Sequence, residues 1–396
     1  MDNVLISSPV GVMFMLVFVA AFWFWVEQVT SWKFFNLIPP LLFIYATPVI
    51  LNNIGVIPSD SPVYGGMRDY VLPVFIVLML LKVNVPAAIK VMGKGVLVML
   101  MGTAGVVVGA VVSYAIVSRW LSPDAWKGFG ALAGSWIGGT GNMAAAAAAL
   151  DTPADIFGLA VLADNVVYIV WLPILLGSKS FADKFNKWAR VHPDRIKQMD
   201  DAAASLDLSE RTIVMRDYLY LVALALMVTW LSNVIGPLLP ELSLGAENPV
   251  ITTSVWKLLL VTTMALSLSV TPARRLPGST TIATAIIYVF VAAMGARASI
   301  EGLGQAPAFL LGAFIWIFIH GAFCLLGAWL FRVDVHSVAI ASAANIGGAA
   351  SAPIVAAYHR PSLVPVSILM ALIGYALGNF LAILAGELAH WAGGGG

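Results

Sequence analysis

Hydrophobic residues in the chain gather into twelve long blocks, with six blocks on each side of a polar stretch. A membrane-spanning helix needs about 17–25 mostly apolar residues, and most of these blocks reach or approach that length. The blocks cover residues 10–26, 35–51, 70–83, 94–118, 129–150, 157–177, 217–238, 251–271, 281–296, 305–331, 335–357 and 363–386. The polar stretch between them holds eight Lys and Arg residues. The pattern predicts an all-α polytopic membrane protein with an N-terminal membrane repeat (1–177), a cytoplasmic linker (178–216) and a C-terminal membrane repeat (217–392).

The composition supports a membrane location and excludes several classes of soluble protein. Of the 396 residues, 60% are hydrophobic and 10% are charged, whereas soluble domains carry about 25% charged residues. The balance of 21 Lys+Arg against 20 Asp+Glu leaves no basic excess for binding nucleic acid. The single Cys324 excludes a disulfide framework, and the five histidines form no metal-binding motif. The first block follows Met-Asp-Asn rather than a basic segment, so we expect it to be retained as a membrane helix.

The fifth block of each half has an unusual composition for a membrane helix. Residues 129–150 include the segment GSWIGGTGN (134–142), and residues 335–357 include ASAANIGGAASAP (341–353). Each segment has a Gly-Gly pair, an Asn within a few residues and neighbouring hydroxyl side chains. The pairs begin at Gly138 and Gly347, which are 209 residues apart, roughly half of the chain. This spacing indicates an internal repeat.

Glycine pairs weaken a helix and suggest that both segments break. A glycine inside a helix costs about 1 kcal/mol relative to alanine. Unwound backbone at membrane depth is tolerated only inside the protein or beside a water-filled cavity. Paired broken segments at corresponding places in two halves are typical of the substrate site of a transporter. The alternative is that the glycines only allow close packing of helices, as in GxxxG motifs.

The distribution of Lys and Arg favours a re-entrant path for the fifth blocks. Cytoplasmic loops of membrane proteins collect positive charge, and the linker is taken as cytoplasmic. If all twelve blocks cross, 14 Lys and Arg lie inside and 7 outside; if the fifth blocks enter and return, 16 lie inside and 5 outside. The sequence therefore predicts two inverted repeats of about five spanning helices each, with a broken or re-entrant glycine-rich segment in each repeat.

Three segments resemble the signature stretches of the bacterial YjcL-like membrane protein family, a domain of unknown function. They are GSWIGGTGN (134–142), ADNVVY (163–168) and ASAANIGG (341–348), and the resemblance extends over nearly the whole chain. The sequence GGAASA (347–352) departs from the Gly-Gly-Pro expected there, although Pro353 follows it. More distantly, the design is similar to sodium–glutamate, sodium–hydroxycarboxylate and sodium–bile-acid carriers. This resemblance implies elevator-type transport by an inverted-repeat protein, and we expect a homodimer in the inner (cytoplasmic) membrane of a bacterium.

Broken helices would place polar backbone groups in the middle of the membrane. The free N–H groups at a helix start carry about +0.5 charge and the free C=O groups at its end about −0.5, so they attract anions and cations respectively. Thr140 and Asn142 in the first segment, and Ser342, Asn345 and Ser351 in the second, add side-chain oxygens. The alternative for each Asn is that it caps its own half-helix. The predicted substrate-binding residues are Gly138, Gly139, Thr140, Asn142, Asn345, Gly347, Gly348 and Ser351.

Asp164 is the one carboxylate well inside a block, and it is a candidate for coupling transport to an ion. An ionisable residue at membrane depth costs about 2.5–3.5 kcal/mol and is expected to have a function. With Asn165 beside it, Asp164 can complete a cation site or carry a proton; the alternative is a structural ion pair with Lys82 or another base at the end of a span. Oxygen ligands suit a hard cation such as Na+, for which Asn142, Asp164 and Asn345 are the candidate ligands. The predicted coupling residues are Thr140, Asn142, Asp164, Asn165, Ser342 and Asn345.

These features predict an ion-coupled secondary transporter rather than an enzyme. The cargo is expected to be a small polar metabolite, preferably anionic, such as an organic acid, an amino acid or a small peptide. The sequence has no Walker A motif for coupling to ATP, so we expect a gradient of Na+ or H+ and no other cofactor. Membrane lipid is the expected surrounding, and no nucleic acid is expected as a partner. The alternative is a Na+/H+ exchanger or an ion channel without an organic substrate, which would favour more buried carboxylates.

The two topologies differ in the faces on which Lys127 and Arg360 lie. The re-entrant arrangement places Lys127 outside and Arg360 inside, whereas twelve crossings reverse both positions. Single cysteines at these positions, introduced together with Cys324→Ala, should react with a membrane-impermeant maleimide from outside only at position 127. Labelling of position 360 from outside would contradict the re-entrant topology.

Overall fold

The computed structural model describes residues 4–30, 35, 40–204, 212–242, 251–298 and 304–394. Helices make up 84% of the chain, and the only β contact within the described residues is an isolated bridge between Leu242 and Ile251. The prediction of an all-α protein is therefore confirmed.

The first half contains the six hydrophobic elements in the order that the blocks predict. It begins with α1 (Pro9–Thr30), α2 (Pro40–Asn53) and a continuous run of α3 (Pro62–Gly66), η2 (Met67–Val71) and α4 (Leu72–Leu80). A short helix, α5 (Val85–Met92), leads to the long helix α6 (Lys94–Val117). The broken pair α7 (Ala125–Gly138) and α8 (Thr140–Ala149) and the long helix α9 (Ala154–Gly177) complete the half.

The linker and the second half follow the same plan. The linker contains α10 (Ala182–Trp188) and α11 (Arg195–Ala204). Three helices then follow, α12 (Met215–Ile235), α13 (Thr253–Ser269) and α14 (Ser279–Gly295). The half ends with the long helix α15 (Ala306–Phe331), the broken pair α16 (Val335–Ile346) and α17 (Gly348–His359), and the long helix α18 (Val364–Ala392).

Seven helices among the described residues are long and apolar enough to cross a membrane, so the chain is a multi-pass membrane protein. They lie in Pro9–Thr30, Pro62–Leu80, Lys94–Trp120, Ala154–Trp188, Met215–Leu238, Ala306–Phe331 and Pro361–Ala392. Three shorter apolar helices, α2, α13 and α14, have 14, 17 and 17 residues, at or below the usual lower limit of about 17. The ten crossings that the sequence predicts require these three to cross as well, and they stay a prediction.

Both fifth blocks are broken at their glycine pairs. The first breaks at Gly139 and the second at Gly347, and α7 packs against α8 as α16 packs against α17. The first pair folds back tightly, because a methyl group on Gly134 would lie 2.7 Å from the carbonyl oxygen of Asn142. We call α7–α8 hairpin 1 and α16–α17 hairpin 2. The inversion of one half relative to the other stays a prediction.

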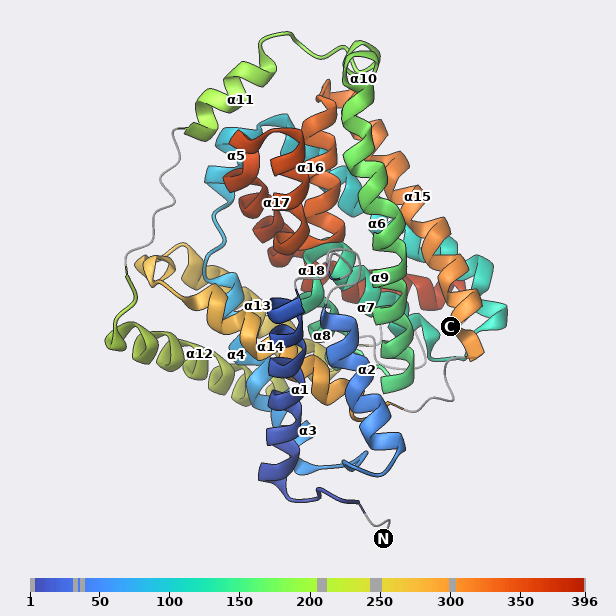
Figure 1. Ribbon diagram of the computed structural model, residues 1–396, viewed down its shortest axis with the longest axis vertical. Helices are drawn as coiled ribbons and strands as arrows, with labels where there is room; N and C mark the ends of the chain where they lie inside the picture. Colours follow the sequence, from blue (N-terminus) through green and yellow to red (C-terminus); the bar gives the residue numbers. More distant parts are fainter. Residues whose placement is uncertain are drawn as a thin grey trace.

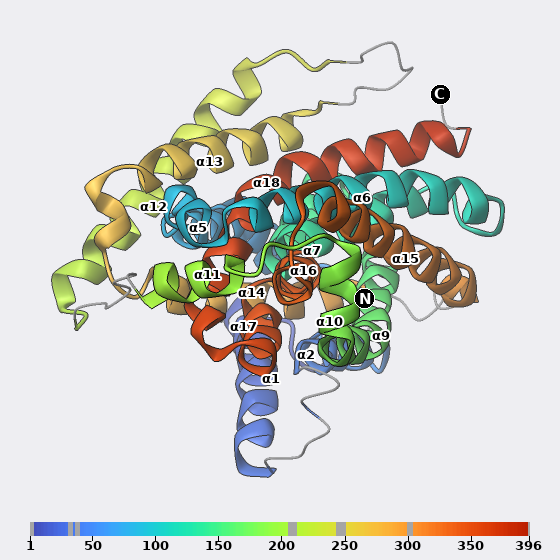
Figure 2. The same ribbon diagram turned by 90° about the horizontal axis from the view of Figure 1, so that it is seen from above.

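The helices pack into two groups (Figure 1). The core group contains α6 to α9 and α15 to α18, in which α6 packs along α15 and α7 packs along α18. The outer group contains α1 to α4 and α12 to α14, in which α4 contacts α12, α13 and α14, and α14 also contacts α2. Seen from above, α12 and α13 lie side by side at one edge, and α15 lies along α6 (Figure 2). Both hairpins therefore belong to the core group.

Glycines on α6 allow α15 to approach closely. A methyl group on Gly105 would lie 2.6 Å from Cβ of Phe323, and one on Gly109 would collide with the ring of Trp316. Trp316 is fully buried and its indole N–H donates to the carbonyl oxygen of Val106 at 2.6 Å, so the ring has no room to move. Lipid gives no hydrophobic driving force between helices, and such small-residue contacts stabilise their packing instead.

The two linker helices lie against hairpin 2 and α5 (Figure 1). The side-chain oxygen of Asn186 accepts a hydrogen bond from the backbone N–H of Val335 at 3.1 Å. Nε of Arg195 lies 3.0 Å from the carboxylate of Asp334, which is fully buried, and Nη2 donates to the carbonyl oxygen of Met92 at 3.2 Å. Arg195 therefore joins the linker both to the start of hairpin 2 and to the first half of the chain.

The α6–α15 contact predicts that Gly109→Ala destabilises the protein. The added methyl group overpacks a site occupied by Trp316, and overpacking costs about 1–3 kcal/mol. Thermal unfolding in detergent should show a lower midpoint than for the unaltered chain. Gly65→Ala is the matched control, because nothing lies within 4 Å of a methyl group at that helical position. Equal midpoints for the two variants would contradict the role of Gly109.

Candidate functional site

The tips of the two hairpins meet inside the core group. A methyl group on Gly139 would lie 3.7 Å from Cα of Gly348, and one on Gly348 would lie 3.5 Å from Cα of Gly139. Either methyl group would also lie 3.3 Å from the ring of Tyr375 on α18. Two segments about two hundred residues apart in the chain therefore break at the same place in the molecule.

The backbone at the tips takes conformations that favour glycine. Gly139 has φ +78° and ψ −177°, a region that is essentially restricted to glycine. Gly348 has φ +58°, the left-handed region that glycine reaches without steric cost. The N–H of Gly139 ends α7 by donating to the Ser135 carbonyl at 2.6 Å, and its own carbonyl accepts from the N–H of Asn142 at 3.0 Å to start α8. The glycine pairs thus cause the breaks that the sequence predicts.

Tyr375 of α18 contacts both tips through hydrogen bonds. Its hydroxyl accepts from the N–H of Ala349, at the start of α17, at 3.1 Å. Its carbonyl oxygen accepts from the side-chain amide of Asn142, on α8, at 2.9 Å. One residue of α18 therefore fixes hairpin 1 and hairpin 2 relative to each other.

A cavity of about 100 Å³ lies beside the place where the two hairpin tips meet. Six of the residues predicted from the sequence line it. The residues that line it are Leu41, Ser135, Gly139, Thr140, Asp164, Asn165, Tyr168, Tyr288, Ile346, Gly347 and Ser351. They come from both hairpins and from α9, with Leu41 and Tyr288 added by α2 and α14 of the outer group. The cavity is therefore bounded by the core group on one side and by the outer group on the other.

The cavity lining is rich in oxygen atoms and contains one carboxylate. Asp164 is partly accessible from the cavity, and one of its oxygens accepts from the indole N–H of Trp136 at 2.9 Å. The hydroxyl-bearing residues Ser135, Thr140 and Ser351 line the same space, and the lining includes no Lys, Arg or His. Such a set of oxygens can hold a hard cation, a proton on the carboxylate, or the N–H groups of a substrate.

Asn142, Asn345 and Ser342 lie outside this cavity. Asn142 is 0% exposed, and its side-chain oxygen has no hydrogen-bond partner. The amide of Asn345 lies against α6, 3.0 Å from the hydroxyl of Thr103. Ser342 accepts from the indole N–H of Trp171 at 3.0 Å. Of the three candidate Na+ ligands, only Asp164 faces the cavity, because Asn142 contacts α18 and Asn345 contacts α6.

Sequence reasoning missed several residues of the site. Ser135 and Tyr168 lie within the segments GSWIGGTGN and ADNVVY, so their position beside the glycines and Asp164 could have suggested them. Leu41, Tyr288 and Tyr375 lie in apolar helices, where no local feature of the sequence tells which residue faces a cavity.

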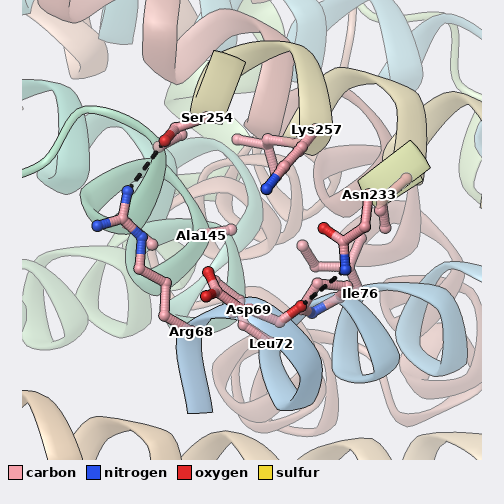
Figure 3. Close-up of a pocket in the computed structure, with 13 residues that line it drawn as sticks. Arg68, Asp69, Leu72, Ile76, Ala145, Asn233, Ser254 and Lys257 are labelled. Atoms are coloured by element: carbon pink, nitrogen blue, oxygen red, sulfur yellow. Dashed lines mark hydrogen bonds between the residues drawn. The ribbon is translucent and has the colours of Figure 1, made fainter. Parts of the chain in front are cut away.

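A second, smaller cavity lies where the outer group meets hairpin 1 (Figure 3). It has a volume of about 60 Å³ and lies between α4, α12, α13 and α8. The guanidinium of Arg68 donates to the hydroxyl of Ser254 at 3.0 Å and forms an ion pair with Asp151, just after α8, at 2.6 Å. The α8 side of the cavity consists of Ala145, Ala148 and Ala149. Arg68 therefore connects the outer group to the end of hairpin 1 across a surface of small side chains.

Comparison with known proteins identifies the family. Residues 14–390 match the family model described as "Protein of unknown function (DUF819)", and the chain belongs to this family. The chain is also 26% identical over 374 residues to the uncharacterized membrane protein YjcL of Bacillus subtilis (strain 168), an alignment that covers 91% of this chain and 92% of the relative. The resemblance to a YjcL-like family is therefore confirmed.

The backbone at the first tip predicts that Gly139→Ala distorts the site. An alanine is strained at φ +78°, which costs about 1–3 kcal/mol. The unfolding midpoint in detergent should fall below that of Gly177→Ala, a control in which the added methyl group meets nothing within 4 Å. If both variants unfold together with the unaltered chain, the tip is not held in the conformation described.

Proposed function

We propose that this member of the DUF819 family is an ion-coupled secondary transporter of a small polar metabolite, and we assign it no catalytic role. The observation that carries the proposal is the meeting of Gly139 and Gly348 beside one cavity that both hairpins and Asp164 line. Broken segments that converge on a common site are the arrangement by which many secondary transporters hold cargo and ion. The proposed cargo classes are organic acids, amino acids and small peptides.

The ends of the half-helices support binding of both charges. α8 and α17 start at the tips and α7 and α16 end there, so partial positive and partial negative backbone charges lie close together. Thr140, the first residue of α8, lines the cavity, so the start of this helix is the proposed position for an anionic group of the cargo. We therefore assign the carboxylate of an organic acid or amino acid to this position.

The coupling ion is assigned to Asp164. Its carboxylate faces a cavity that also contains Ser135, Thr140 and Ser351, which suits either a bound Na+ or a transferable proton. The unpartnered side-chain oxygen of Asn142 is a second candidate ligand, because a buried acceptor without a hydrogen bond is costly. A cation within its reach would remove that cost. The proposal needs no other cofactor.

The position of the cavity supports alternating access of the elevator type. Core helices provide most of the lining, whereas Leu41 and Tyr288 come from the outer group. A shift of the core group along the outer group would carry the cavity with it. The alanine surface of α8 at the second cavity offers few side chains that would obstruct such a shift, and the Arg68–Asp151 ion pair would have to break. We place the protein in the inner membrane of a bacterium as a homodimer.

A second candidate function is Na+/H+ exchange or ion conduction without an organic substrate. It is favoured by a lining without basic side chains and by a cavity of about 100 Å³. A thermal-shift screen of the purified protein against organic acids, amino acids and dipeptides, with and without Na+, separates the two. A ligand that binds only the folded state at 100 times its Kd stabilises it by about 2.7 kcal/mol. Stabilisation by Na+ or pH alone, with no organic ligand, would favour the second candidate.

Asp164→Asn should remove the ion dependence of transport. Loss of a charge-assisted contact of about 1.5–3 kcal/mol corresponds to a decrease of at least about tenfold in the response of uptake to Na+ or to pH. Uptake of the cargo found in the screen, measured in proteoliposomes with imposed Na+ and H+ gradients, tests this expectation. Asp155→Asn, in the first turn of the same helix and outside the cavity, is the matched control. Unchanged Na+ and pH profiles in Asp164→Asn would remove this residue from coupling.

A further inference from the structure

A large apolar cavity lies beside α16 of hairpin 2, away from the two glycine tips. It lies between α9, α10, α15 and α16 and has a volume of about 440 Å³. This volume is within the range of ligand pockets, about 300–1,000 Å³. Trp171, Phe185, Phe318, Leu325 and Val338 contribute to its walls. It is separate from the cavity at the hairpin tips, with which it shares no lining residue.

The chemistry of the walls selects an apolar guest. Ser342, the polar residue at the α16 wall, accepts from the indole of Trp171 at 3.0 Å and lies 2.9 Å from Nε2 of His320. The sulfur of Cys324 lies 3.5 Å from the same nitrogen. These polar atoms already have partners, so the cavity offers a guest little besides van der Waals contact. Phe318 and Leu325 are exposed on the outer surface of α15, which leaves the cavity open toward the lipid.

Basic and aromatic residues surround one end of the cavity. The chain between residues 179 and 190 has four basic residues and one acid. Lys184 is exposed on α10, next to Phe185 of the cavity wall. The guanidinium of Arg190 lies 5.0 Å from the ring of Trp329, four residues and therefore one helical turn beyond Leu325. Exposed Trp residues and Lys or Arg side chains next to a membrane helix are typical of the region of lipid headgroups.

We propose that this cavity binds one acyl chain of an anionic phospholipid whose phosphate lies between Lys184 and Arg190. The apolar walls select the chain, and the positive charge of the rim selects an anionic headgroup over a zwitterionic one. The bound lipid contacts α16 of hairpin 2 together with α9 and α15. It thereby occupies a binding site that does not overlap the transport cavity.

Cys324 is buried, but Ala322 is exposed and lines the cavity, so a single cysteine at position 322 together with Cys324→Ala reports on its occupancy, and this variant is the starting protein for all the measurements below. The purified full-length protein in detergent is treated with N-ethylmaleimide after addition of either phosphatidylglycerol or phosphatidylcholine with the same acyl chains. Phosphatidylglycerol should slow alkylation at concentrations at which phosphatidylcholine does not. Each basic side chain near a membrane surface changes the affinity for anionic lipid about fivefold, so Lys184→Gln with Arg190→Gln should abolish the preference.

Two further variants separate a specific site from general lipid contact. Leu325 is exposed and lines the cavity, so Leu325→Trp should fill the space and remove protection by phosphatidylglycerol. Leu311→Trp, at an exposed position on the same helix outside the cavity, should leave protection unchanged. Equal protection of Ala322→Cys by the two lipids, or a preference that survives when Lys184→Gln and Arg190→Gln are added, would overturn the proposal. Neither result depends on whether the chain transports a metabolite, because alkylation is measured without any cargo.

Discussion

A peptide group inside a bilayer must find a hydrogen-bond partner within the protein, and this constraint governs how the two hairpins are built. Each break interrupts a helix among buried residues, where an unpaired N–H or C=O costs several kcal/mol. The carbonyl of Gly139 is paired with the N–H groups of Asn142 and Met143 at the start of α8. The hydroxyl of Tyr375 takes the N–H of Ala349 at the start of α17. The first break is therefore paired within hairpin 1, and the second gains a partner from α18.

Glycine makes this meeting possible in two separate ways. Positive φ at Gly139 and Gly348 turns the chain, and the missing side chains let the two Cα atoms approach each other beside Tyr375. The ends of the half-helices then lie beside a small cavity whose lining residues are all buried or half-buried. In such an environment the charge of Asp164 and the partial charges of the backbone act more strongly than in water. The glycines that weaken the helices thus also bring the partial charges of the backbone close to the charge of Asp164.

The sequence predicted the apolar blocks, both break points and six residues of the cavity, because each of these has a local cause. A glycine pair with further small residues around it weakens a helix locally, and a lone carboxylate in an apolar block needs a polar surrounding. The places of the two Asn side chains in the folded hairpins could not be derived from composition alone. Asn142 follows its glycine pair and lies on the second arm of hairpin 1, whereas Asn345 precedes its pair and lies on the first arm of hairpin 2. The contribution of Tyr288 depends on how α14 packs against the core group, which is a property of the tertiary structure.

A difference between the two long helices that follow the hairpins explains why the cavity lies on one side. The offset of 209 residues that relates the glycine pairs also relates Asn165 of α9 to Gly374 of α18. At Gly374 the carbonyl oxygen of Ile137 comes so close that a methyl group would collide with it. This close contact lets α18 lie directly on α7 and leaves no space between them.

Around Asn165, the position of α9 that corresponds to Gly374 of α18, the polar side chains of Asp164, Asn165 and Tyr168 line the cavity instead of closing it. Glycine on α18 and polar residues on α9 therefore give the two halves of the chain different roles. The second half supplies a rigid support for hairpin 1 through α18, and the first half supplies the carboxylate through α9. Hairpin 2 completes the cavity with Ile346, Gly347 and Ser351. Both hairpins thus break at glycines, and the chemistry of the site arises where the side chains of α9 and α18 differ.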